Sequence, residues 1–192
     1  TAGTGGSVAR QVVAGFRMSA AAETDAQFAS TRVDVGGAGT LATQHAEARI
    51  GALGLAPGAA FTLAPAAGIV SETAYTLAAD VLATAPGATI AIQPNGAQPG
   101  TLVVGTLDAR AGGPVTVTGG RLAAPDGALT LIVATPTKRG VTPLLDLRAS
   151  AWTGPLAITV VDGAGAPVKG KAYLSGGVLK FDTTTGTALI LR

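Results

Sequence analysis

Short apolar runs divided by glycine or proline pairs are the main pattern of this chain. Between residues 101 and 126, the pairs Gly112-Gly113 and Gly119-Gly120 separate three such runs. Residues 115–118 read Val-Thr-Val-Thr, a period of two that sends both valines to one face of a strand and both threonines to the other. Paired glycines supply the positive φ angles that tight reversals need. The stretch therefore predicts a strand, a glycine turn and another strand.

The same unit recurs over most of the chain. Pro57-Gly58 and Pro86-Gly87 are strong turn signals, and the alternation Phe61-Thr62-Leu63 resumes just after the first of them. Strands are expected roughly every 10–15 residues, which is typical of sandwiches, barrels and solenoids. No exact internal repeat aligns, so a solenoid would have irregular coils. The pattern predicts an all-β fold: an irregular β-helix or solenoid, with a jelly-roll-like β-sandwich as the alternative.

Residues 8–31 are the most ambiguous part of the chain. A helical spacing of four residues is met by Val8, Val12, Phe16 and Ala20. A strand period of two is met by Val12, Ala14, Phe16 and Met18. Gly15 weakens the helix, so we favour the strand. We therefore expect an N-terminal segment, residues 1–48, with a strand or short helix and a possible inter-subunit contact, before a β-rich main domain, residues 49–192.

Composition changes the picture of the surface. Hydrophobic residues make up 47% of the chain but aromatic residues only 4%, so the core must consist of Ala, Val, Leu and Ile. Charged residues are 12%, about half of the roughly 25% in ordinary soluble domains. Either identical neighbours cover much of the surface, or the surface is simply rich in Thr, Ala and Gly. We favour the first interpretation, and hence a homo-oligomer or polymer.

Several classes of protein are not indicated. The net charge is +2 and the basic residues are scattered, whereas a nucleic-acid binder would need a basic stripe with stacking aromatics. No apolar run reaches the roughly 18–20 residues of a membrane-spanning helix. Cysteine is absent, which excludes thiol chemistry and disulfides and fits an exported protein. A chain that begins at Thr1 without a signal peptide is expected of a processed, mature product.

Candidate chemistry is sparse. His45 shares a predicted strand face with Glu47, but a lone histidine cannot form a multi-histidine zinc site, and we interpret it as structural or solvated. Asp108 with Arg110, and Asp146 with Arg148, are spaced so that stacked strands could align them into a ladder of ion pairs. The same residues could form the basic site of a polysaccharide lyase, but we favour edge or surface pairs that aid register and solubility. We expect no catalytic residue, no metal ligand and no cofactor.

The turn at residues 162–165 and the lone indole carry weaker signals. Asp162-Gly163-Ala164-Gly165 lacks the oxygen-rich spacing of a calcium loop. Trp152 is the single tryptophan of the chain. We expect it to anchor the core or a subunit contact, and the alternative is a platform on which a glycan stacks.

The sequence of residues 49–133 and 172–191 resembles the β-strand repeats of secreted proteins grouped with bacterial autotransporter passengers. Those repeats combine an apolar strand, a Pro/Ala-Gly-Ala turn and a Thr-Leu strand. The pattern stands here in residues 53–63, 85–92 and 100–107, and residues 173–181 resemble the end of such a passenger. The resemblance implies an extracellular right-handed parallel β-helix or related β fold with a structural or adhesive role. It transfers no catalytic residue.

Together these observations predict a non-enzymatic structural protein, extracellular or on the cell surface, that assembles into a surface layer or filament. The alternatives are a carbohydrate-binding or adhesive module, a virion coat protein, and a β-helix enzyme acting on glycans. We expect assembly to proceed head to tail by donation of a strand from residues 1–18. The candidate interface residues are Val8, Val12, Phe16, Met18 and Trp152.

Overall fold

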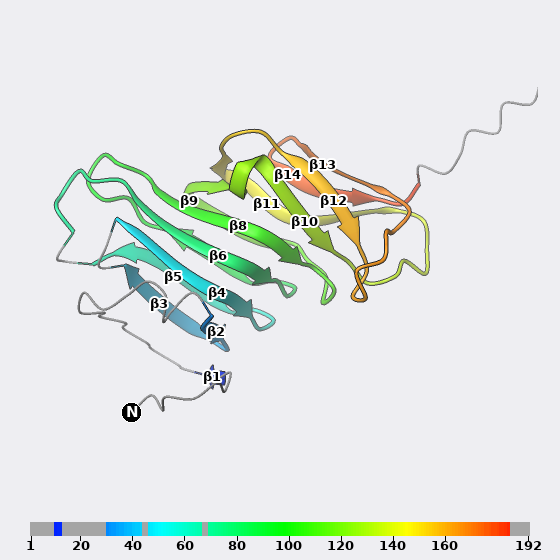
Figure 1. The fold of residues 1–192 in the computed structure, drawn as a ribbon, viewed down its shortest axis with the longest axis horizontal. Coiled ribbons are helices and arrows are strands. Elements are labelled where there is room, and N and C mark those ends of the chain that lie inside the picture. The colour runs from blue at the N-terminus through cyan, green and yellow to red at the C-terminus, as the bar shows by residue number, and fades with distance from the viewer. Residues whose placement is uncertain (1–9, 13–29, 44–45, 67–68, 185–192) are drawn as a thin grey trace, which may run out of the picture.

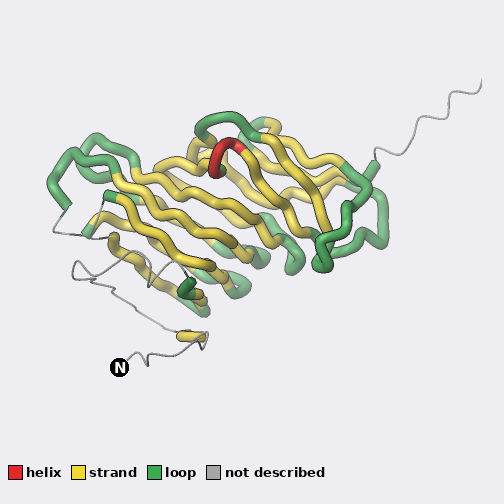
Figure 2. Tube along the Cα trace, in the orientation of Figure 1, coloured by secondary structure: helices red, strands yellow, loops and turns green. Residues whose placement is uncertain are grey.

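The structure is a computed structural model that describes residues 10–12, 30–43, 46–66 and 69–184. Strands make up 60% of it, and they coil into a β-solenoid of about five turns. This confirms the predicted all-β fold and selects the irregular solenoid over the sandwich. A short helical turn, η1 (Pro125–Gly127), interrupts the strands (Figure 2). The described residues contain no helix long and apolar enough to cross a membrane.

The strands follow one another along the chain with short connections. Their bounds are β1 (Arg10–Val12), β2 (Arg32–Val35), β3 (Ala38–Thr43), β4 (Glu47–Leu55), β5 (Ala60–Pro65), β6 (Tyr75–Ala83), β7 (Thr89–Ile92), β8 (Gly100–Asp108), β9 (Val115–Ala123), β10 (Ala128–Ile132), β11 (Val141–Trp152), β12 (Ala157–Val161), β13 (Lys171–Ser175) and β14 (Val178–Asp182).

The coils form two layers of parallel strands. The first layer runs β1, β2, β4, β6, β8, β10 and β12. The second layer runs β3, β5, β7, β9 and β11, and then β14 and β13 in antiparallel pairing. Each coil therefore passes through one layer, turns, and returns through the other, so that successive coils advance from the N-terminal to the C-terminal end (Figure 1).

The coils differ in length, which explains why no repeat aligns in the sequence. The residues that pair in one column of the first layer are Arg32, Ala52, Val81, Thr106, Thr130 and Thr159. The step along the chain from Arg32 to Ala52 is clearly shorter than the step from Ala52 to Val81. The extra residues are accommodated in the connections, so the strand registers stay aligned while the sequence period does not.

Two predicted turns lie at the same edge of the stack. Pro57-Gly58 and Pro86-Gly87 both form turns, with φ of 70° at Gly58 and 73° at Gly87. The turns stack on each other, since Gly58 N donates to Pro86 O at 3.1 Å. These predictions are confirmed.

The Gly119-Gly120 pair has a different role from the expected reversal. Val115 and Val117 face the core and Thr118 is exposed, as the alternation predicted. The strand then continues through both glycines, which have φ of 66° and 46°, and residues 121–123 join the first layer beside β8. A Cβ at Gly119 would lie 2.5 Å from Ile92 O. The glycines therefore form a corner inside one strand and not a turn between two.

The core consists of aliphatic ladders between the two layers. In-register pairing stacks the equivalent inward residue of each coil on the next one. One ladder of the first layer is Val33, Leu53, Leu82, Leu107, Leu131 and Val160. A ladder of the second layer is Phe61, Ile90 and Val117. Burial of these side chains supplies the main favourable term in folding, and the expectation of a core poor in aromatic residues is correct.

The C-terminal end of the solenoid is closed by a hairpin. Gly176-Gly177, with φ of 58° and 72°, joins β13 and β14, the geometry favoured for tight hairpins and predicted by the glycine pair. β14 pairs antiparallel with β11, which ends the parallel stacking. Residues 166–168 lie along β12, where Val168 N donates to Val160 O at 3.2 Å. A lysine and a proline, Lys171 on β13 and Pro167 beside β12, protect these edges.

The expected division between residues 48 and 49 falls within β4, which spans Glu47–Leu55. β2 and β3 stack directly on β4 and β5 through parallel pairing. Residues 32–43 thus belong to the same solenoid as the residues that follow.

The ladders predict which side chains on one strand matter for stability. Leu102→Ala on β8 removes a side chain with 0% exposure and should lower the free energy of unfolding by about 2–5 kcal/mol. Val103→Ala, at the next position on the outer side of the strand, should cost clearly less. Urea denaturation of both variants measures the difference. Equal losses would contradict the assignment of inner and outer faces.

Candidate interaction surface

Four of the five predicted interface residues cannot be placed as side chains. Val8, Phe16 and Met18 lie outside the described residues. Val12 ends β1, where its backbone pairs opposite Asp34. His45 also lies outside the described residues.

Trp152, the fifth residue, is at the end of β11. It pairs opposite Leu122 and packs against the core while remaining partly exposed. Its indole Nε1 is buried and has no hydrogen-bond partner among the described residues. The backbone of the neighbouring Thr153 is held in place without the indole, because its N–H donates to Leu122 O at 2.8 Å. Trp152 therefore extends the inner ladder of residues 77, 102 and 122 rather than standing on the outer surface.

The two predicted Asp–Arg pairs both form ion pairs. Arg110 Nη2 lies 2.6 Å from Asp108 Oδ2, and Arg148 Nη2 lies 2.5 Å from Asp146 Oδ2. The hydrogen bond from Arg110 lowers the pKa of Asp108. The hydrogen bond from Arg148 lowers the pKa of Asp146 to about 2. The arginines are more than half exposed, so solvent screens each pair and its contribution to stability is small.

The two pairs do not stack into one ladder, which the spacing had left open, and they stand as separate surface pairs. Asp108 ends β8 in the first layer, whereas Asp146 lies on β11 in the second layer, opposite Thr116. The column of Asp108 contains Asp34, Gly54 and Ala83. A side chain at position 54 would collide with the carboxylate of Asp34, so glycine there leaves room for the ion pair of Arg32 with Asp34.

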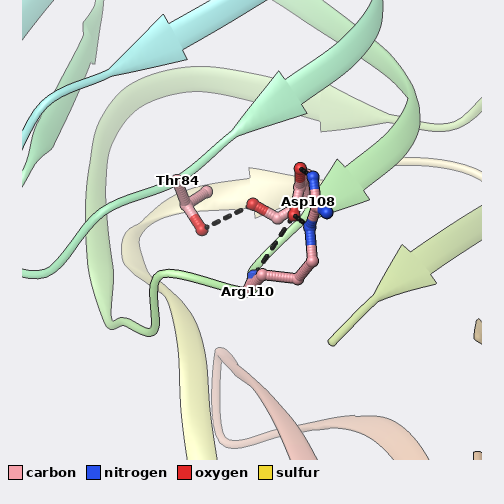
Figure 3. A network of polar contacts seen from close by, with 3 residues as sticks. All are labelled: Thr84, Asp108 and Arg110. Atoms are coloured by element: carbon pink, nitrogen blue, oxygen red, sulfur yellow. Dashed lines mark hydrogen bonds and ion pairs between the residues drawn. The ribbon is translucent and has the colours of Figure 1, made fainter. Parts of the chain in front are cut away.

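Figure 3 shows that the Asp108–Arg110 pair also fixes a turn of the backbone. Arg110 N donates to Asp108 Oδ1 at 3.2 Å. Thr84, at the end of the neighbouring coil, donates from its hydroxyl to Asp108 O at 3.3 Å and from its backbone N–H to the same oxygen at 2.9 Å. These contacts join two successive coils. Thr84, Asp108 and Arg110 each contact the backbone or a side chain of the solenoid, and this favours a structural role for the cluster.

Other polar residues hold the connections in the same way. Asp162 Oδ1 accepts hydrogen bonds from Ala164 N and Ala166 N, both at 2.9 Å, so this carboxylate closes its own turn. Asn95 Nδ2 donates to Val70 O and Thr73 O, both at 2.9 Å. Among the described residues, no group of three or more His, Cys, Asp or Glu side chains could hold a metal ion.

Tyr75 locks the start of one coil against the next. Its ring is fully buried. Its hydroxyl donates a hydrogen bond to Gln93 O and lies 3.3 Å from a second acceptor, Leu63 O. Gly100 is its register partner on β8, and a Cβ there would lie 2.5 Å from the Tyr75 Cζ and Oη atoms. The missing side chain of Gly100 thus provides the space that the ring occupies.

The outer surface of the second layer differs from that of the first. The first layer carries Arg32–Asp34 and Arg49–Asp80 as ion pairs with N–O distances of 2.9 and 2.8 Å. The strands β3, β5 and β7 and residues 115–118 contain no charged residue. Their outward side chains form two columns across four strands. The columns are Ala38, Ala60, Thr89 and Thr116, and Thr40, Thr62, Ala91 and Thr118. We call these eight residues the threonine–alanine face.

Charge returns immediately beyond this face. Asp146 and Ala149 of β11 continue the two columns opposite Thr116 and Thr118, and Asp146 is paired with Arg148. Farther on, Lys180 and its register partner Tyr173 point outward, because the adjacent Leu179 and Phe181 are buried. The threonine–alanine face is therefore an uncharged area with a charged C-terminal border.

Reasoning from the sequence did not identify the threonine–alanine face. The signal was present in the pattern Ala-Gly-Thr, Ala-Phe-Thr, Thr-Ile-Ala and Thr-Val-Thr at the starts of these strands. The register partners that begin these patterns are unequally spaced along the chain, at Ala38, Ala60, Thr89 and Thr116. Only the pairing reveals that they form columns.

Comparison with known proteins adds no assignment. No family model, no curated protein and no solved structure matches the chain.

The packing of Tyr75 predicts an unequal effect of two glycine substitutions. Gly100→Ala should lower the free energy of unfolding by about 1–3 kcal/mol, because the new Cβ enters space filled by a buried ring. Gly37→Ala is the matched control, since a Cβ there meets nothing within 4 Å. Chemical denaturation should show little change for the control. A near-neutral Gly100→Ala would disprove the tight contact.

Burial of Tyr75 also predicts a dependence of stability on alkaline pH. Burial raises the pKa of Tyr75 to about 12, above the ordinary value of about 10. The unfolded chain then loses this proton first, so the free energy of unfolding falls between about pH 10 and pH 12. Tyr75→Phe lacks this titrating group. From pH 8 to pH 11, the free energy of unfolding of the wild type should therefore fall relative to that of the variant. Urea denaturation at both pH values tests this, and a constant gap would contradict it.

Proposed function

We propose that this chain is a non-catalytic structural subunit, extracellular or on the cell surface, that assembles with copies of itself. The observation that supports this best is the unequal distribution of charge. Two ion pairs lie on the outer side of the first layer, whereas the threonine–alanine face carries none. The free-energy cost of removing water from an uncharged, regular surface is small when a neighbour binds to it.

The chemistry of the described polar residues supports the same proposal. Asp108, Asp162 and Asn95 are engaged in hydrogen bonds that close turns or join coils. Such residues build a stiff scaffold, and a stiff scaffold suits a subunit that must present one surface in a constant shape. The function therefore follows from the shape and the surface rather than from a cluster of reactive groups.

The closed C-terminal end supports a proposal for the mode of assembly. The antiparallel hairpin β13–β14 and Lys171 on its outer strand disfavour addition of a further strand at that end. We infer that copies associate through the outer surface of one of the two layers and not through the ends of the solenoid. Strand donation by residues 1–18 stays a prediction, because most of these residues lie outside the described part of the chain.

Self-association is tested directly in solution. Sedimentation velocity of the purified chain, from low to high micromolar concentration, should show a weight-average mass that rises above that of the 18.6 kDa monomer. Electron microscopy of the same samples distinguishes discrete oligomers from filaments or shells. A chain that remains monomeric over the whole range would refute the proposed function.

A further inference from the structure

The threonine–alanine face is the surface of the molecule that is best suited to contact a second copy. All eight of its side chains are Ala or Thr, in columns that continue from β3 to residues 115–118 of β9. Five of them, Ala38, Thr40, Ala60, Thr89 and Thr118, are exposed. Short, uncharged side chains allow two such surfaces to approach closely without burying an unpaired charge.

The distribution of charge along the solenoid axis selects the orientation of the two copies. Residues 30–127 contain four arginines and six carboxylates, which gives a net charge of −2: Arg32, Arg49, Arg110 and Arg121 with Asp34, Glu47, Glu72, Asp80, Asp108 and Asp126. Residues 128–184 contain six basic residues and three carboxylates, which gives +3: Lys138, Arg139, Arg148, Lys169, Lys171 and Lys180 with Asp146, Asp162 and Asp182. The C-terminal end is thus basic, and the coils before it are acidic.

A two-fold axis can relate two stacked faces in two ways. If it runs along the solenoid, the basic ends lie side by side and repel each other. If it runs along the strands, the solenoid axes are antiparallel and the basic ends are as far apart as possible. The second arrangement also turns each basic end towards the acidic coils of the partner copy. In it, β3 of one copy meets β9 of the other.

We propose that two copies of this chain pack face to face through their threonine–alanine faces, with antiparallel solenoid axes. This inference rests on the proposed self-association and names the surface that it uses. Four strands about 4.8 Å apart, with four to six residues at about 3.3 Å each, cover roughly 300 Å² per copy. This is less than half of a standard interface, so the dimer is weak and forms in the micromolar range or above.

The first test places a charge in the middle of the contact. Thr89→Lys puts an ammonium group on the threonine–alanine face of each copy, and the dissociation constant measured by sedimentation should rise at least about tenfold. Thr159→Lys is the matched control, because Thr159 is also exposed but lies on the outer side of β12 in the first layer. The control should dimerise as the wild type does. Circular dichroism of both variants verifies that they are folded.

The second test determines the orientation. The chain has no cysteine, so Thr40→Cys on β3 and Thr118→Cys on β9 each introduce the only thiol. In the antiparallel dimer, position 40 of one copy faces position 118 of the other. A short bismaleimide should therefore cross-link a mixture of the two variants and give little product with either variant alone.

The outcomes separate this inference from the proposed function. A wild-type chain that is monomeric at every concentration refutes both. Oligomers that persist in Thr89→Lys leave self-association standing and overturn the threonine–alanine face as its surface. Cross-linking within Thr40→Cys alone shows parallel axes and overturns the proposed orientation. Cross-linking of the mixture, with loss of the dimer in Thr89→Lys and not in Thr159→Lys, supports the proposal.

Discussion

Stacking of like on like between successive coils is the interaction on which this structure depends. Leu53, Leu82 and Leu107 occupy equivalent inward positions, and each buries its neighbours along the axis. Each coil contacts mainly the coils before and after it, so stability is a sum of neighbour contacts. The ring of Tyr75, at the start of one coil, is accommodated only because its partner position is Gly100.

The inward ladders also determine the outer surfaces. Strand pleat turns every second side chain outward, so the pairing that stacks the leucines also aligns the residues between them. In the first layer these include Arg32–Asp34 and Arg49–Asp80. In the second layer they are the alanines and threonines of the threonine–alanine face. One solenoid thus presents two unlike surfaces. Its low overall charge reflects the threonine–alanine face, because the outer side of the first layer carries ion pairs.

The two ends of the stack are not equivalent. At the C-terminal end, the direction of pairing changes at β14, and a hairpin with Lys171 on its outer strand finishes the second layer. A parallel solenoid could otherwise add coils without limit, because every coil presents an open strand to the next. Antiparallel closure ends this series. It also concentrates Lys169, Lys171 and Lys180 at one end and makes the solenoid electrically polar along its axis.

Local sequence determined the strands and many of their turns. The valine–threonine alternation of residues 115–118, the turns at Pro57-Gly58 and Pro86-Gly87, and the hairpin at Gly176-Gly177 depend on φ preferences and on a period of two, which neighbouring residues alone specify. The columns could not be predicted, because coils of unequal length hide the register. For the same reason, the spacing left open whether the ion pairs of Asp108 and Asp146 share one ladder, and the structure places them in different layers. Only the pairing of distant strands decides which residues share a face, since that choice is made by the buried ladders of the whole stack.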